Sequence, residues 1–324
     1  MFHYNNDSDG DKAVVTYNRK IQKYIVNTQE RWLIIHSPSN TTTSSSTTTA
    51  VLVFHGSTSA TDDTANDPLF AVRRFERNYD TPYFRQHREW HGYTMIYLAA
   101  RLEDGWFCWE NNNGRQHSPD GNDAKFVQAI GEEFVFDKIY ALGFSGGARF
   151  VWKHRELFDA IAPIAGGLAP SLRHNEATTT TNDCIPAVVF HGDQDTFNDI
   201  QANRDSVVWY QEHCKCTSLQ TTKYYQDEGN INVTLTLYQD CDDVDFYLHF
   251  YTIHGAGHTL PGAPLVWSGL GPISSFDSLE HMWYTWTTGG NVIPPPSSAP
   301  QLDTTGIFAV LFLWTILLSF WRFS

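Results

Sequence analysis

Positively charged side chains are scarce in this sequence: 22 Lys and Arg residues stand against 36 Asp and Glu residues, giving a formal net charge of −14 at pH 7. A protein with this balance repels a phosphate backbone, so the composition argues against nucleic acid as a partner. The N-terminal region, residues 1–30, is polar and has no apolar run after a basic start. No signal peptide is therefore recognisable.

Cysteine spacings typical of metal or redox sites are also missing. The five cysteines are Cys108, Cys184, Cys214, Cys216 and Cys241. The pair at 214 and 216 has the spacing C-x-C rather than C-x-x-C, which disfavours a zinc or redox motif. We expect one or two disulfides formed in an oxidising compartment, with one thiol left over. Three Asn-x-Ser/Thr sequons, at Asn6, Asn40 and Asn232, are compatible with secretion.

Apolar residues are plentiful enough for a large core. They make up 41% of the 324 residues, and aromatic residues make up 15%, including eleven tryptophans. A chain of this length forms one large domain of about 250 residues or two smaller ones. The tryptophans indicate a large packed interior or a cleft lined by aromatic side chains.

The most informative stretch is Gly-x-Ser-x-Gly, centred on Ser145. An apolar run at 139–142 predicts a buried strand, and residues 148–157 predict a helix directly after the motif. In this context the motif predicts a nucleophile elbow, a tight turn that holds the serine in strained backbone angles. The serine hydroxyl then lies at a helix N-terminus, where the helix dipole favours developing negative charge.

Strand and helix patterns alternate along most of the chain. Strands are predicted at 31–36, 51–54, 93–100, 139–142, 160–167, 187–190, 231–239 and 246–253. Helices are predicted within 60–90 and at 123–134, 148–157, 204–213 and 275–286. This alternation predicts one α/β domain, a mostly parallel sheet with helices on both faces.

Three side chains that together could activate a nucleophile follow predicted strand ends. They are Ser145, Asp195 and His258, and their order along the chain is that of the α/β-hydrolase triad. A serine needs a histidine to remove its proton, and the histidine needs a carboxylate to fix its tautomer. The competing residues are Asp193, Asp199, His254 and His281. Any one of these, taken alone, is more often a surface carboxylate or a core histidine.

Two further strand ends could contribute to such a site. The strand at 51–54 runs into His55, Gly56 and Ser57, where backbone N–H groups could join that of Gly146 in an oxyanion hole, although an ordinary turn explains the pattern equally well. After the strand at 93–100, the loop at 104–110 is rich in aromatic residues and includes Trp106 and Trp109. These tryptophans either contact a substrate or pack under a long loop.

The motifs together resemble the secreted esterases related to polyhydroxybutyrate depolymerases and feruloyl esterases, over roughly residues 30–287. The resemblance rests on Gly-Phe-Ser145-Gly-Gly-Ala, Ala-Pro-Ile-Ala-Gly-Gly at 162–167, His-Gly-Asp-Gln-Asp195, the segment from Trp209 to Cys214 and Cys216, and Gly-Ala-Gly-His258-Thr-Leu-Pro-Gly. It implies that Asp195, not Asp193, is the triad acid and that His258 is the base. It also implies a disulfide between Cys214 or Cys216 and Cys241. That family usually has a tryptophan where Leu260 stands, so one substrate contact of the family is expected to be lost here. Leu260 is kept, with Trp106 and Trp109, as a candidate substrate-binding residue.

The resemblance implies acyl transfer by a serine esterase, with no metal or cofactor. The expected substrates are carboxylic esters, either feruloyl or acetyl esters of polysaccharides or short polyesters. Two alternatives stay open: a catalytically inactive α/β-hydrolase fold that serves as a surface recognition protein, and a cofactor-free lyase or transferase.

The sequence further predicts four regions: a polar extension at 1–30, the catalytic domain at 31–290, a Pro/Ser-rich linker at 291–306 and an apolar tail at 307–324. The uncharged run at 307–321 is short for a bilayer-spanning helix, which needs about 20 residues. It is interpreted as a membrane anchor or as a GPI-attachment signal with Ser297 or Ser298 as the site. We expect membrane association on the extracellular side; a tail anchor facing the cytosol is the alternative.

Overall fold

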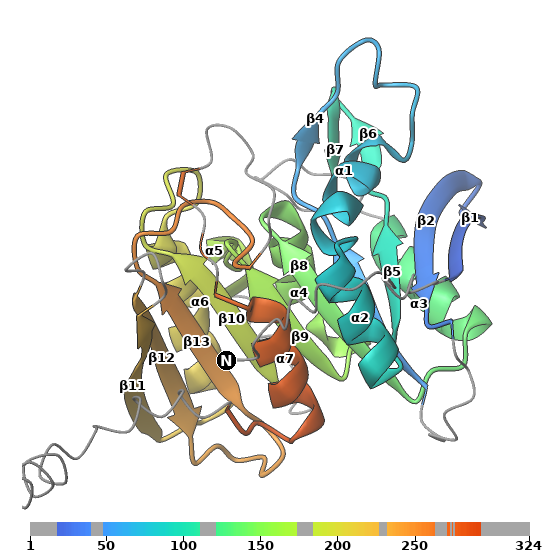
Figure 1. Ribbon diagram of the computed structural model, residues 1–324. Coiled ribbons are helices and arrows are strands. Elements are labelled where there is room, and N and C mark those ends of the chain that lie inside the picture. The colour runs from blue at the N-terminus through green and yellow to red at the C-terminus, as the bar shows by residue number, and fades with distance from the viewer. Residues whose placement is uncertain are drawn as a thin grey trace, which may run out of the picture. The chain divides into compact units, whose positions relative to one another are not determined.

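Ten strands form one sheet in the order β1-β2-β5-β3-β8-β9-β10-β13-β12-β11 (Figure 1). In that order they are β1 (Asn18–Val26), β2 (Gln29–Ser37), β5 (Thr94–Leu98), β3 (Thr49–Phe54), β8 (Lys138–Phe144), β9 (Ala160–Ile164), β10 (Ala187–Gly192), β13 (Leu248–Ile253), β12 (Asn232–Gln239) and β11 (Ser218–Gln226). The strands from β5 to β13 run parallel to their neighbours. Antiparallel pairs flank them on both sides.

The structure is a computed structural model that describes residues 18–39, 48–110, 121–173, 184–226, 232–262, 271–272, 274 and 276–292. All of these residues belong to one unit, Gly10–Val292. The predicted tail at 307–324, the linker from 293 onward and the candidate GPI sites lie outside the described residues. Within the described ranges, no helix combines the length and the apolar character that a bilayer crossing requires.

The helices cover both faces of the sheet. One face carries α1 (Phe70–Tyr79), α2 (Pro82–His91) and α7 (Ser278–Thr287), and the other carries α3 (Asn122–Glu133), α4 (Gly146–Lys153) and α6 (Ile200–His213). A short helix, α5 (Pro170–Arg173), and a 3₁₀ turn at Arg155–Leu157 complete the helical elements of the described chain. The predicted mostly parallel sheet with helices on both faces is confirmed, and it is an α/β-hydrolase fold.

The central strands explain why this prediction succeeds. Every side chain of β9, β10 and β13 is buried. Successive residues alternate between the two apolar cores, so that Val188 packs on one face and Val189 on the other. A strand covered on both faces has a continuous apolar sequence, and such a run is easily recognised.

The domain begins earlier than the predicted boundary at residue 31. Strand β1, which lies within the predicted polar extension at 1–30, pairs with β2 along its whole length, and Arg19 forms a 2.7 Å ion pair with Glu76. Only Val26 of this strand is buried. An edge strand exposed on most of its surface has a polar sequence, so its pattern does not differ from that of an extension.

A second, three-stranded sheet lies beyond the C-terminal ends of β3 and β5. It consists of β4 (Thr58–Ser59), β7 (Trp106–Cys108) and β6 (Arg101–Glu103). The segment at 104–110, predicted to be a loop, therefore contributes a short strand. In the chain, β4 follows the His55–Ser57 turn directly, so the small sheet is connected to the predicted oxyanion segment without an intervening loop.

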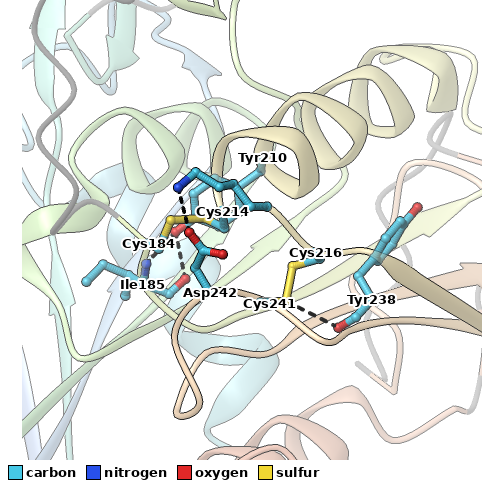
Figure 2. The surroundings of a disulfide bond; sticks show 9 residues. Cys184, Ile185, Tyr210, Cys214, Cys216, Tyr238, Cys241 and Asp242 are labelled. Atoms are coloured by element: carbon cyan, nitrogen blue, oxygen red, sulfur yellow. Dashed lines mark hydrogen bonds and ion pairs between the residues drawn. A yellow bond between two sulfur atoms is a disulfide. The ribbon is translucent and has the colours of Figure 1, made fainter.

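Two disulfides brace the end of the sheet that carries β11 and β12 (Figure 2). Cys184, just before β10, bonds to Cys214 at the end of α6, and Cys216 bonds to Cys241. The second bond is one of the two pairings that the resemblance implied. Cys108 is buried and forms no disulfide, so one thiol is left over as expected, all five cysteines being among the described residues.

We predict that the Cys216–Cys241 bond stabilises the domain chiefly by lowering the conformational entropy of the unfolded chain. It closes a loop with a sequence separation of 25 residues, so replacing both cysteines with serine should lower the free energy of unfolding by about 3.5 kcal/mol. Urea unfolding monitored by tryptophan fluorescence measures this change. Reducing agent should destabilise the wild type more than the double variant. An equal effect on both proteins would contradict a stabilising Cys216–Cys241 disulfide.

Candidate active site

Ser145 lies in the sharp turn between β8 and α4, with φ 54° and ψ −112°. Two glycines permit the close contacts that this turn requires. A Cβ atom on Gly147 would overlap the carbonyl group of Phe54 in β3, and one on Gly143 would overlap the carbonyl group of Gly147. The Ser145 N–H donates to the Ile164 carbonyl oxygen in β9 at 2.8 Å, which fixes the turn against the neighbouring strand. Strained angles of this kind persist only where the surrounding structure enforces them.

The structure brings the three predicted side chains together. Ser145 Oγ lies 3.0 Å from His258 Nε2, and His258 Nδ1 lies 2.7 Å from Asp195 Oδ2. The three residues follow the C-terminal ends of β8, β13 and β10. The Asp195 side chain has no exposed surface and that of His258 is 6% exposed. A hydrogen-bonded chain therefore runs from a buried carboxylate through an imidazole to the serine hydroxyl.

The Asp195 carboxylate is held by several donors besides His258. The backbone N–H groups of Phe197 and Asn198 both donate to Oδ1 at 2.9 Å, and His191 Nε2 lies 3.2 Å from Oδ2. Burial alone would raise the pKa of Asp195, but the hydrogen bonds from His191 and His258 outweigh it and hold the pKa well below its usual range. The carboxyl group therefore stays ionised and accepts a hydrogen bond from His258 Nδ1–H.

His191, the first residue of the His-Gly-x-x-Asp motif, is a supporting residue that sequence reasoning missed. Its Nε2 faces the Asn198 carbonyl oxygen at 2.9 Å as well as Asp195, so this nitrogen carries the proton. Its Nδ1 then accepts from the Asn203 side-chain amide at 2.8 Å. The ring is thus fixed in one tautomer that donates to the carboxylate. The i, i+4 spacing to Asp195 is visible in the sequence, but it does not show that the two side chains meet.

The competing residues have other contacts. Asp193 binds His254 Nδ1 at 2.8 Å and the Gly255 N–H at 2.7 Å. Burial would raise the pKa of Asp193, but these bonds lower it. Asp199 caps the N-terminus of α6 through a 2.9 Å bond from the Gln201 N–H. His281 is buried in α7, and this burial lowers its pKa to about 4.

The predicted oxyanion segment lies next to the serine. A Cβ atom on Gly56 would lie 3.1 Å from Ser145 Cβ. Buried His55 holds the turn: its Nδ1–H donates to the Gly56 carbonyl oxygen at 2.7 Å, and its Nε2 accepts from the Ala100 N–H at 3.1 Å. Burial lowers the pKa of His55 to about 4, so the ring is neutral and can do both. Ser57 follows in the same turn.

On the other side of the serine, Gly146 is the first residue of α4. N–H groups in the first turn of a helix have no partner within the helix. The roles of Gly146, Gly56 and Ser57 as oxyanion donors stay predictions.

The three predicted substrate-binding residues differ in exposure. Trp106 in β7 is 40% exposed, so its ring is accessible to a ligand. Trp109 is fully buried, packs against Phe54 and Phe150, and donates from Nε1 to the His55 carbonyl oxygen at 2.8 Å. The prediction of substrate contact is therefore wrong for Trp109, which instead packs against His55 and holds the His55–Gly56 turn.

Leu260 is only 5% exposed and belongs to the apolar core on the α7 side of the sheet. Its contact with a substrate stays a prediction.

Two aromatic rings flank the His258 imidazole. The ring centroid of Phe144 lies 4.8 Å from that of His258, and the ring centroid of Phe197 lies 5.5 Å from it. The hydrogen-bonded chain at Ser145 is suited to nucleophilic attack with general-base assistance.

Among the described residues, a cluster with metal-ligand spacing consists of His87, His91 and Glu280 and contains none of the three residues of that chain.

Comparison of the sequence with protein-family models and with curated proteins gives no match. Among solved structures, the chain is similar to a thermostable esterase, with a TM-score of 0.43 and 16% identity over 60% of this chain and 52% of that one. It thus spans about half the length of that esterase.

A ferulic acid esterase has a TM-score of 0.40 and 10% identity over 62% of this chain and 86% of its own. The acylaminoacyl peptidase of Pyrococcus horikoshii has a TM-score of 0.39 and 12% identity over 62% of this chain and 36% of its own. Likenesses at this level carry no statement about reaction or substrate.

The two neighbouring carboxylates can be distinguished by mutation. Asp195→Asn should lower kcat for ester hydrolysis on the order of 10⁴-fold, because an amide at this position favours the wrong His258 tautomer. Asp193→Asn is the matched control, because Asp193 contacts His254 and Gly255 instead, and it should cost far less. Steady-state kinetics with a p-nitrophenyl ester measures both effects. A larger loss in Asp193→Asn would assign the acid to Asp193.

Proposed function

We propose that this protein is a serine hydrolase that cleaves carboxylic esters through an acyl-enzyme on Ser145, with His258 as general base and Asp195 as the triad acid. The observation that carries the proposal is the hydrogen-bonded chain from Asp195 through His258 to Ser145 Oγ, at 2.7 Å and 3.0 Å. The 3.0 Å separation lets His258 take the Ser145 proton, and the 2.7 Å separation lets Asp195 orient the imidazole. The order of the residues and their places after parallel strands also support it.

In the proposed mechanism, Ser145 Oγ attacks the ester carbonyl carbon while His258 Nε2 takes the hydroxyl proton. The ionised Asp195 stabilises the imidazolium that forms. The developing oxyanion lies near the backbone N–H groups of Gly146 and of the Gly56–Ser57 turn. The tetrahedral intermediate collapses, and His258 gives its proton to the departing alcohol. Water activated by His258 then attacks the acyl-enzyme and releases the acid.

The alternative of an inactive surface recognition protein finds less support. An inactive site has no need for a buried, ionised carboxylate that receives four hydrogen bonds, and burying such a charge costs several kcal/mol unless it is fully compensated. Here the compensating donors are the two histidines and the two backbone N–H groups around Asp195. Their arrangement also orients His258 toward the serine.

As substrates we propose feruloyl or acetyl esters of polysaccharides or short polyesters. The exposure of Trp106 favours a substrate with an aromatic acyl group. Its indole is accessible and belongs to the small sheet that follows the proposed oxyanion turn in the chain. An aromatic ring stacked on this indole would gain about 0.5–1.5 kcal/mol beyond its area burial.

Ser145→Ala should lower ester hydrolysis by about three to six orders of magnitude and leave the fold intact. A panel of p-nitrophenyl esters of increasing chain length measures the loss, and circular dichroism checks the fold. Ser59→Ala, at an exposed position in β4, is the matched control and should keep full turnover. Substantial turnover by the Ser145 variant would exclude this residue as nucleophile, and an inactive wild type would favour the recognition protein.

Trp106→Ala should raise KM for a feruloyl ester by about two- to tenfold, as expected for the loss of one stacking contact. KM for an acetyl ester of the same alcohol should change much less. Trp90→Ala, which removes a tryptophan that is 69% exposed on α2, serves as the control. Equal shifts of KM for both esters would show that Trp106 does not contact the acyl group.

A further inference from the structure

Helices α2 and α7 lie side by side on one face of the sheet (Figure 1), and three potential metal ligands meet between them. His87 and His91 are one turn apart on α2, and Glu280 is in the first turn of α7. One ligand atom from each residue lies within 4.8 Å of the other two. His87 Nε2 and Glu280 Oε2 are already 2.9 Å apart. This cluster is separate from the triad and has no role in the proposed reaction.

The surroundings of His87 suit a ligand nitrogen. Its side chain is 2% exposed, and its Nδ1 lies 3.0 Å from the Tyr93 hydroxyl group. A metal-bound histidine needs a partner for its other ring nitrogen, which fixes the tautomer and the ring orientation. With a cation on Nε2, Nδ1–H would donate to the Tyr93 oxygen. The Tyr93 side chain is itself fully buried, which fixes its hydroxyl group beside His87.

The other two ligands lie within reach of a shared cation. Glu280 faces His87 at 2.9 Å, and the ring centroid of His91 lies 4.4 Å from that of His87. The Trp283 ring, stacked on Tyr93 at 4.3 Å, lies 5.3 Å from the His91 ring and forms an apolar wall beside the ligands.

We propose that His87, His91 and Glu280 bind a divalent cation of the Zn²⁺ class, and that this cation ties α2 to α7. Two imidazole nitrogens and one carboxylate oxygen are a ligand set that Zn²⁺ accepts, with water in the fourth position. Tetrahedral ligands at 2.0–2.1 Å from the metal are about 3.4 Å apart. His91 is exposed and can rotate to close the remaining gap. The cation takes the place of the proton shared by His87 and Glu280.

The bound metal would stabilise the domain without entering the reaction. Helix α7 contributes Leu279, Met282 and Trp286 to the core that covers this face of the sheet. A ligand that binds the folded state alone stabilises it by mass action. A metal concentration a hundredfold above Kd should therefore raise Tm by about 5–10 °C.

The test uses the full chain without a histidine tag, treated with EDTA and then dialysed. Isothermal titration with ZnCl₂ should give one equivalent bound, and thermal unfolding should show the rise in Tm. His91→Ala and Glu280→Gln should weaken Zn²⁺ binding at least a hundredfold and abolish the rise. Both variants are expected to fold, because His91 is exposed and the glutamine is isosteric with Glu280. Gln86→Ala, at a half-buried position on the same helix, is the matched control and should bind as the wild type does.

Three outcomes would overturn the proposal. The first is no binding by the wild type at micromolar Zn²⁺. The second is equal affinity in the wild type and in His91→Ala. The third is loss of binding in His254→Ala instead, which would place the metal at the Asp193–His254 pair. Each outcome is independent of whether the protein hydrolyses esters.

Discussion

The site depends above all on the buried charge of Asp195. A carboxylate without solvent contact is costly unless hydrogen bonds replace its lost hydration. The donors come from two segments: His191, Phe197 and Asn198 belong to β10 and the loop after it, and His258 belongs to the loop after β13. The charge therefore ties two strand-end loops together. Any change that removes a donor affects the position of His258 as well as stability.

A second constraint is the close approach of backbone at the elbow. Gly147 lies so near the Phe54 carbonyl group that no side chain fits between β3 and α4. The same strand leads into the His55–Gly56 turn, which Trp109 and Ala100 hold by hydrogen bonds. Because Ser145 and the His55–Gly56 turn are positioned by the same strand, their relative geometry follows from backbone packing. This arrangement suits a site whose donors must be placed before the reaction begins.

The sequence predicts those features that arise from local pattern. The central strands have continuous apolar runs because they are buried on both faces, and the three strand-end residues follow from the parallel order of the sheet. Strand β1 exposes most of its side chains and therefore has a polar sequence, and neither it nor the other edge strand, β11, is recognised. Their existence depends on pairing with β2 and β12 rather than on their own composition.

Features that depend on contacts between distant parts of the chain cannot be predicted from local sequence patterns. The role of His191 is decided by Asn198 and Asn203, which face its two ring nitrogens. Trp109 could equally have lined a cleft, and only its burial and its bond to the His55 carbonyl oxygen decide otherwise. The i, i+4 histidines of α2 are visible, but Glu280 joins them only because α7 packs beside that helix.

The most direct test of Ser145 as an activated nucleophile is covalent labelling of the full-length protein with a fluorophosphonate, followed by peptide mass spectrometry. An activated serine displaces fluoride and keeps the phosphonyl group, whereas an ordinary serine hydroxyl is a weak nucleophile. We predict one adduct, on Ser145, whose formation slows by orders of magnitude in His258→Ala. A folded wild-type protein that takes up no label, or an adduct on a different residue, would contradict it.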